Sequence, residues 1–361
     1  MKTDNLKMPL ISFIIAAYNV KSYILDAVNS IVEQWDNRFE IIVIDDGSTD
    51  GTRQLLEEYK AKLPNHINFV LYSQKNTGIS SVRNIGISLA KGEYVAYLDG
   101  DDLYLKNKLN EIVKILINTN VDCLVTNFFY LFDDDYQNND NVCYFLENEV
   151  IRNDKENTFL INLYKGKQLY PWKYIIKADI LKKYDYPLGK TYEDVNTLPL
   201  QIFSCKTIYY SSEGILAYRQ RQDSIMKIKS KENILSLSSS LIRISNFIKE
   251  YYRNNIPKSL ALEHSIFNLY LFTWACGDSL ANKNILPKYI YKEIKSNFIN
   301  ANLIDLKIVK DELKNRDKRT LNKFLLFFYI PSSFYFSHYL KYKFNRLYRL
   351  LNKVRNFIYK T

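Results

Sequence analysis

Cysteine and histidine are scarce in this sequence, and their scarcity excludes two kinds of site. The 361 residues include only three histidines and four cysteines, with no C-x-x-C pair: Cys123, Cys143, Cys205 and Cys276. A structural zinc centre needs about four such ligands at short spacings, and a disulfide scaffold needs a denser set of cysteines. The sequence therefore predicts neither, and the free thiols suit a reducing compartment.

Long hydrophobic runs are also missing. The apolar run at residues 10–17 has eight residues, whereas a spanning helix needs roughly 20. That run is not followed by a small-residue cleavage site, so it does not have the pattern of a signal peptide. Residues 324–340 are apolar and aromatic, but Pro331 and several polar residues interrupt them. We expect no membrane-spanning helix.

Acidic residues are absent after Asp317, and this sets the end of the chain apart. Residues 1–317 hold 40 basic and 39 acidic residues, and ten further Lys or Arg follow. A nearly neutral body argues against general nucleic-acid binding, and a basic tail indicates a local anionic partner. One apolar stripe runs through this tail at helical spacing: Leu340, Phe344, Leu347, Leu351, Val354 and Ile358.

The tail therefore predicts an interfacial helix on an anionic membrane surface, with residues 324–340 dipping into the headgroups. The protein would then be cytoplasmic and peripheral on the inner face of the cell membrane. The alternative is a basic helix packed on the protein or on a second subunit of a homo-oligomer.

Strand-like and helix-like runs alternate in the first part of the chain. Apolar strand runs occur at residues 10–16, 39–44, 67–73, 94–98 and 123–128, and helical spacing at 21–34, 52–62, 79–90 and 106–117. This alternation predicts an α/β fold with a mostly parallel sheet flanked by helices. From about residue 231 the pattern is helical. We expect a catalytic domain over 1–228, a helical region over 229–317 and the tail over 318–361.

Polar clusters stand at successive crossovers of the predicted sheet. Ligands of open α/β sheets bind beyond the carboxyl ends of the strands, so clusters at these points predict one composite site. The clusters are Ala17-Tyr18-Asn19, the acidic turn from Asp45-Asp46 to Thr52, the loop from Asn76 through Arg83 to Gly86, and Asp99-Gly100-Asp101-Asp102.

The last cluster predicts a metal site. Asp99 and Asp101 repel each other, and a hard divalent cation, Mg²⁺ or Mn²⁺, relieves this while bridging to substrate phosphates. Gly100 lets the backbone come close, and Asp102 is expected to cap the helix that follows. The alternative is that the whole cluster is a helix cap.

The second cluster predicts contacts with a nucleotide. Asp45 and Asp46 could accept hydrogen bonds from a base N–H or a ribose hydroxyl, as carboxylates at strand ends do in dinucleotide-binding folds. The alternative is a turn and helix cap, which Asp50 and Thr52 can form by themselves.

Two further side chains each allow two interpretations. Tyr18 offers an aromatic face for a base to stack on, or it packs in the core. Arg83 carries a fork of donors that suits pyrophosphate or base oxygens, or it makes a surface ion pair.

The middle of the chain supplies a candidate base and candidate cations. Asp194 could take the proton of an attacking hydroxyl, or Glu193-Asp194 could simply begin a helix, where the macrodipole favours acidic residues. Arg219 and Arg221 could hold a diphosphate, or mark an exposed strand end.

Four of these segments together resemble the inverting family 2 glycosyltransferases with the GT-A fold, of the type that builds bacterial surface polysaccharides. They are SFIIAAYN, EIIVIDDGSTDGT, NTGISSVRNIG and YVAYLDGDD. The resemblance is dense over residues 9–104 and looser to about 226, through the PWK and TYED segments, and nothing beyond 230 takes part in it.

The resemblance implies roles for particular residues. Ala17, Tyr18, Asn19, Asp45 and Arg83 would lie at a nucleotide, usually uridine diphosphate, with Asp99 near the ribose and Asp101 on the metal. Asp194 would be the base, and Trp172 and Glu193 would lie near the sugar or the acceptor, a glycan or a lipid-linked glycan. The Q-x-x-R-W motif of the processive members is absent, which favours transfer of a single hexose or N-acetylhexosamine.

Two other functions stay open on the sequence alone. A sugar nucleotidyltransferase can share this fold, but it would want a Gly-rich basic loop after the first strand, and residues 16–21 are not one. A non-catalytic glycan-binding protein is the other, and it would not need Asp99, Asp101 and Asp194 together.

Overall fold

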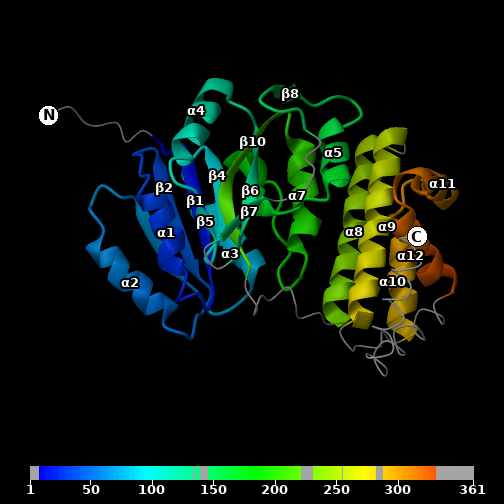
Figure 1. The fold of residues 1–361 in the computed structure, drawn as a ribbon, viewed down its shortest axis with the longest axis horizontal. Helices are drawn as coiled ribbons and strands as arrows, with labels where there is room; N and C mark the ends of the chain where they lie inside the picture. Colours follow the sequence, from blue (N-terminus) through cyan, green and yellow to red (C-terminus); the bar gives the residue numbers. More distant parts are fainter. Residues whose placement is uncertain are drawn as a thin grey trace. The chain divides into compact units, whose positions relative to one another are not determined.

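The computed structural model describes residues 8–132, 135–138, 145–220, 231–253, 255–281 and 288–330. The chain divides into two compact units, Met1–Ser224 and Ile225–Thr361. The first, blue to green in Figure 1, is a sheet with flanking helices, and the second, yellow to orange, is helical. Each unit is described in turn.

The first unit is organised by a sheet with the strand order β3-β2-β1-β4-β9-β6-β10-β5, where β7 also pairs with β6 and β8 with β10. The strands are β1 (Ile11–Ala17), β2 (Phe39–Asp45), β3 (Phe69–Ser73), β4 (Tyr94–Asp99), β5 (Leu103–Tyr104), β6 (Cys123–Phe132), β7 (Asp135–Asn138), β8 (Val150–Arg152), β9 (Tyr174–Lys177) and β10 (Thr207–Arg219).

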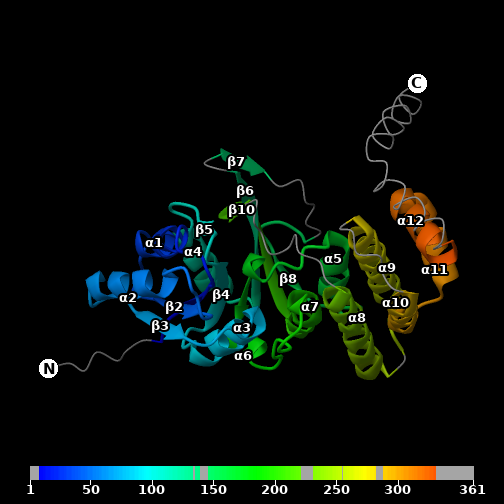
Figure 2. The same cartoon turned by 90° about the horizontal axis from the view of Figure 1, so that it is seen from below.

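Helices cover both faces of this sheet. Figure 2 shows α1 and α4 on one face and α3 and α6 on the other. The helices of the unit are α1 (Ile24–Val32), α2 (Thr52–Lys62), α3 (Ile79–Leu89), α4 (Leu109–Thr119), α5 (Thr158–Gly166), α6 (Ala178–Leu181) and α7 (Glu193–Ser204), with a 3₁₀ turn, η1 (Pro171–Lys173). Since both faces are covered, every residue of β2 is buried and its sequence is almost continuously apolar.

The predicted α/β class is confirmed, and the five predicted strands and four predicted helices of residues 10–132 are present. Strands β3, β2, β1 and β4 are parallel. Beyond β4 the sheet is mixed, because β9 runs antiparallel to both β4 and β6 and separates them. Four residues, YIIK, form β9, and they are too few to show a period in the sequence.

The second unit consists of helices in the described residues. They are α8 (Lys231–Tyr252), α9 (Lys258–Ala281), α10 (Lys288–Ala301), α11 (Leu306–Arg316) and α12 (Lys318–Tyr329), which confirms the helical pattern expected after residue 231. Figure 1 shows α8, α9 and α10 side by side, and Asn268 Nδ2 of α9 donates to the Ala301 carbonyl at the end of α10 at 2.8 Å. Each helix that the structure describes is too short or too polar to cross a bilayer.

The start of the predicted membrane-dipping segment packs inside the protein. Phe324, Phe327 and Phe328 of α12 are buried, and the Phe298 ring of α10 lies 6.0 Å from Phe324 and 6.2 Å from Phe328. The expectation that residues 324–340 enter the headgroups is therefore wrong for these three side chains, because their apolar area is already buried against other rings. Residues 331–361, with the amphipathic stripe, lie outside the described residues, and membrane association stays a prediction.

Candidate active site

Strand register brings the predicted polar clusters to one edge of the sheet. Asp45 at the end of β2 pairs with Ala17 of β1, and Asp99 at the end of β4 pairs with Ala16 on the other side of β1. Adjacent strands lie about 4.8 Å apart, so these two aspartates stand roughly 10 Å from each other across β1. That span suits a ligand with several polar groups along its length.

Gly100 is required by the close approach of β4 to β1. Its N–H donates to the Ala16 carbonyl at 2.9 Å, and a Cβ atom added to Gly100 would lie 2.7 Å from that oxygen. A side chain here would force the two strand ends apart. Gly100 thus lets the backbone come close, as the sequence predicted, and the neighbour it approaches is β1.

The turns after β1 and β2 are joined to each other. Asn19 adopts a left-handed conformation, with φ 52°, and its side-chain oxygen accepts the N–H of Thr49 at 2.8 Å. The Asn19 N–H donates to Ser48 Oγ at 3.0 Å. Between these turns Tyr18 is 41% exposed, which excludes the core-packing alternative and leaves its ring accessible.

Asp45 and Asp46 are both buried but have different neighbours. Asp46 accepts the N–H of Thr77 and the N–H of Gly78, both at 2.9 Å, and Gln74 Nε2 at 2.7 Å. Its carboxylate therefore holds the loop that opens α3. Asp45 accepts the N–H of Ser48 at 3.2 Å, a long contact that leaves more of its hydrogen-bonding capacity for a ligand.

The loop after β4 corrects one expectation. Asp102 does not cap a helix, because residues Leu103–Tyr104 pair with β10 as strand β5 and α4 begins only at Leu109. Instead Asp102 Oδ1 accepts the N–H of Arg219 at 2.8 Å, while its buried Oδ2 has no hydrogen-bond partner. Burial, together with the charges of Asp99 and Asp101, raises the pKa of Asp102 well above its usual value.

Arg219 is the cation that the structure brings to this acidic loop. Its Nε donates to the Asp101 carbonyl at 2.8 Å, and its Nη2 lies 3.3 Å from a carboxylate oxygen of Asp26 on α1. The guanidinium also lies 5.1 Å from the centre of the Tyr23 ring. Arg219 thus stands where a diphosphate beside Asp101 would find a positive charge. Arg221, predicted with it, lies outside the described residues.

The acidic loop fits a divalent cation shared with a substrate. Among the described residues, no group of three or more His, Cys, Asp or Glu side chains converges as a complete protein ligand set. Mg²⁺ and Mn²⁺ do not require one, since one or two carboxylates complete their coordination with water and substrate phosphate. Asp99 and Asp101, whose charges contribute to raising the pKa of Asp102, would be the ligands in that arrangement.

Arg83 and Glu193 join helix α3 to helix α7, which also carries Asp194. Arg83 Nη1 and Glu193 Oε1 lie 2.5 Å apart, with side chains 8% and 12% exposed. Arg83 therefore does make an ion pair, but a buried one. Although burial opposes its charge, Glu193 keeps the pKa of Arg83 above its usual value.

Asp194 is half-buried in the first turn of α7. Its Oδ1 accepts the N–H of Val195 at 2.7 Å. Burial first, and then the charge of Glu193, raise the pKa of Asp194 to about 7, against the opposing effects of the Val195 N–H and of Arg83. A carboxylate with this pKa can take a proton near neutral pH. The two sequence interpretations of Glu193-Asp194 are compatible, because the pair also begins a helix.

Trp172 belongs to a cluster of aromatic rings close to the acidic loop. Its ring is parallel to that of Tyr170, with centroids 5.1 Å apart, and stacks on Tyr218 at 5.4 Å. Burial and the charges of Asp102, Asp99 and Asp101 raise the pKa of Tyr218, which places this cluster within electrostatic reach of the loop. Trp172 itself is buried, so Tyr170 and Tyr218 present more of the cluster's surface.

Some residues of the site gave no usable signal in the sequence. The rings of Tyr97 and Tyr186 both contact the Arg83 guanidinium, with centroids at 5.7 and 5.2 Å from it. Asp26 and Tyr23 meet Arg219 from α1. The chain is rich in tyrosine, with 30 copies, so no single tyrosine stood out. Helical spacing placed Asp26 on an amphipathic helix without showing what it faces.

Comparison with known proteins agrees with this geometry. The sequence model of glycosyl transferase family 2 matches residues 12–177. The glycosyltransferase GlyG of Streptococcus pneumoniae is 25% identical over 229 residues, covering 60% of this chain and 73% of the relative. The putative teichuronic acid biosynthesis glycosyltransferase TuaG of Bacillus subtilis is 40% identical over 109 residues, 30% of this chain and 42% of the relative.

Solved structures extend the likeness beyond the matched segment. Residues 1–349 of Staphylococcus aureus TarS, in complex with UDP-GlcNAc, superimpose with a TM-score of 0.66 at 19% identity. The superposition covers 92% of this chain and 91% of that chain, and at this identity it shows a common fold. Together, the family match, the relatives and the fold show that this chain is a glycosyltransferase whose residues 12–177 match glycosyltransferase family 2.

Proposed function

We propose that the chain transfers one hexose or N-acetylhexosamine from a UDP-sugar to a hydroxyl of a glycan or lipid-linked acceptor, with inversion, in the synthesis of a cell-surface polysaccharide. The observation that carries this proposal is that two acidic groups lie on different elements with different surroundings. Asp99 and Asp101 lie at and just after the end of β4, whereas Asp194, with a pKa of about 7, lies in the first turn of α7, directly after the Glu193 that pairs with Arg83. The first group suits a diphosphate with its metal, and the second suits a proton.

The donor would lie across the carboxyl ends of β2, β1 and β4. Tyr18 would stack on the base, Asp45 would accept hydrogen bonds from the nucleoside, and Asp99 would lie near the ribose. Asp101, with Asp99, would hold Mn²⁺ or Mg²⁺, which stabilises negative charge on a diphosphate. Arg219, already at the Asp101 carbonyl, would add a positive charge on the same side. The UDP-GlcNAc bound by TarS, which has the same fold, supports a UDP-sugar as donor.

The reaction would be a single displacement at the anomeric carbon. Asp194 would take the proton of the acceptor hydroxyl as the oxygen attacks, the new glycosidic bond would form, and the bond to the diphosphate oxygen would break. Attack from the face opposite the leaving group inverts the anomeric configuration. The rings of Tyr170, Trp172 and Tyr218 would offer apolar faces to a sugar of the acceptor or the donor.

The decisive experiment compares Asp194→Asn with the wild type. UDP release from UDP-GlcNAc, UDP-glucose and UDP-galactose is measured with Mn²⁺, first with water and then with bacterial cell-wall glycans as acceptors. We expect the variant to lose about 10²- to 10⁴-fold in rate, the usual contribution of a general base. Its affinity for UDP, measured by calorimetry, should be unchanged.

Asp179→Asn is the matched control, because Asp179 is an exposed aspartate on the neighbouring helix α6. It should keep wild-type rates. Full activity in Asp194→Asn would refute the assignment of the base, and full activity in EDTA would refute the role of the metal.

A further inference from the structure

The Arg83–Glu193 pair has features that a purely structural contact does not need. Its partners stand 110 residues apart in the chain and bridge α3 to α7 at 2.5 Å. Both side chains are largely removed from water, and the guanidinium packs against the rings of Tyr97 and Tyr186. Removing two charges from water costs free energy that an apolar pair of similar volume would not incur, so the contact contributes little to net stability.

The position of the pair suggests what it does. Glu193 is the residue directly before Asp194 in the first turn of α7, so a negative charge lies beside the proposed base. Arg83 pairs with Glu193 and acts on Asp194 with the opposite sign. Because Arg83 and Glu193 are largely removed from water and Asp194 is half-buried, these interactions are screened less than they would be at the surface.

We propose that Glu193 and Arg83 are positioning residues that tune the basicity of Asp194 in opposite directions, Glu193 strengthening it and Arg83 restraining it. This inference rests on the proposed function of Asp194 as the base. It gives Glu193 a role in tuning the base, whereas the sequence analysis placed Glu193 near the sugar or the acceptor.

The groups around Asp194 are consistent with control by this one pair. Around Arg83 lie Tyr97, Tyr186 and, at longer range, Asp99 of β4. The helices α5 and α6 also pack against α7. They carry the half-buried Lys165 and the exposed Asp179, and the exposed Lys182 follows α6, so water screens the last two charges most strongly. The charged side chains that shift the pKa of Asp194 are those of Glu193 and Arg83.

The test is the pH dependence of UDP release from UDP-GlcNAc in Mn²⁺, with water as acceptor, between pH 5 and 9. Glu193→Gln removes the negative charge at nearly constant shape. Its activity midpoint should move to lower pH by about one unit. Arg83→Met removes the positive charge and should move the midpoint to higher pH by about one unit. The double variant should fall between the two.

Two conservative variants serve as controls. Arg83→Lys keeps the charge and Glu193→Asp keeps the carboxylate, so both midpoints should stay near that of the wild type even if the rates fall. Melting temperature and UDP affinity identify any variant that is misfolded. If Arg83→Met does not fold, the shift in Glu193→Gln and its absence in Arg83→Lys decide the matter.

The outcomes separate this inference from the proposed function. If Asp194→Asn is inactive while Glu193→Gln, Arg83→Met and the wild type share one midpoint, the inference is overturned and the base assignment stands. If Asp194→Asn is fully active, the proposed base is wrong and the inference fails with it. Midpoints that move in the same direction in both single variants would also overturn the inference.

Discussion

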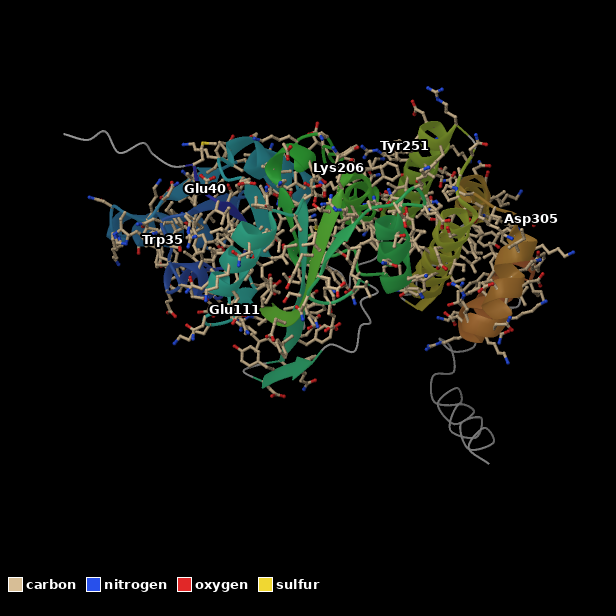
Figure 3. All side chains as sticks on the ribbon, turned by 90° about the horizontal axis from the view of Figure 1, so that it is seen from above. Trp35, Glu40, Glu111, Lys206, Tyr251 and Asp305 are labelled. Atoms are coloured by element: carbon tan, nitrogen blue, oxygen red, sulfur yellow. The ribbon has the colours of Figure 1, made fainter. Side chains whose placement is uncertain are left out.

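Strand β2 carries a carboxylate near each of its ends, and the two have very different surroundings. Glu40, labelled in Figure 3, is 1% exposed near the start of the strand. Its Oε1 accepts hydrogen bonds from the Ser12 hydroxyl, from the N–H of Lys91 at 2.6 Å and from the N–H of Gly92 at 3.0 Å. The protein itself thus satisfies this carboxylate, which ties β1 and the connection before β4 to β2.

At the edge of the sheet where β2 ends, two buried carboxylates accept fewer hydrogen bonds than Glu40 does. Asp45 has one long contact with a backbone N–H, and one carboxylate oxygen of Asp102 is buried without a partner. The charges of Asp99 and Asp101 contribute to raising the pKa of Asp102. A buried carboxylate with donors from its own chain stabilises the fold, whereas like charges gathered at one edge of a sheet are typical of a functional site.

Asp101→Asn, at the proposed donor site, should have the largest effect on the rate of UDP release. The loss of one ligand to a divalent cation removes several kcal/mol of charge stabilisation, so UDP release should fall by about 10³-fold. The melting temperature should stay the same or rise, because a like charge next to Asp99 disappears. A rate within tenfold of wild type in saturating Mn²⁺ would contradict the role of Asp101.

Glu40→Ala should lower the stability of the protein and leave its activity unchanged. The Ser12 hydroxyl and the Lys91 N–H would lose the acceptor that Glu40 provides, and the Gly92 N–H would keep only Ser12 Oγ, at a cost of about 3 kcal/mol in the free energy of unfolding. The melting temperature should drop by roughly 10 °C, while the rate per folded molecule stays at wild type. Glu57→Gln, at an exposed position on α2, is the control and should melt as the wild type does.

The rate of UDP release by the wild type should depend on pH, and this effect is smaller than those of the two substitutions. The raised pKa of Asp194, about 7, means that the base is mostly protonated at pH 6 and mostly ionised at pH 8. UDP release should therefore increase by about tenfold between these values. The residual activity of Asp194→Asn should lack this step, and a flat wild-type profile would argue against Asp194 as the titrating group.

Much of the first unit could be predicted because its signals are local. The apolar runs and helical spacings of residues 10–132 gave the strands and helices, and parallel pairing followed from their alternation. Since parallel strands end at one edge, Asp45 and Asp99 were correctly expected near each other, and the register confirms this.

The remaining features depend on contacts between distant segments. Asp102 looked like a helix cap, but pairing of Leu103–Tyr104 with β10 delays the helix, so tertiary pairing overrode a local preference. The partner of Arg83 could not be read from spacing, because Glu193 is 110 residues away and many other acidic residues were available. The position of β9 between β4 and β6 was hidden for the same reason.

Gly100 has a consequence for anyone who wishes to redesign the enzyme. A side chain at residue 100 would collide with the backbone of β1, so β1 and β4 are held together beneath the proposed donor site. Substitutions on these two strands would displace the proposed ribose and metal contacts together. Changes of donor specificity should therefore be sought first on exposed side chains that overlie it, beginning with Tyr18.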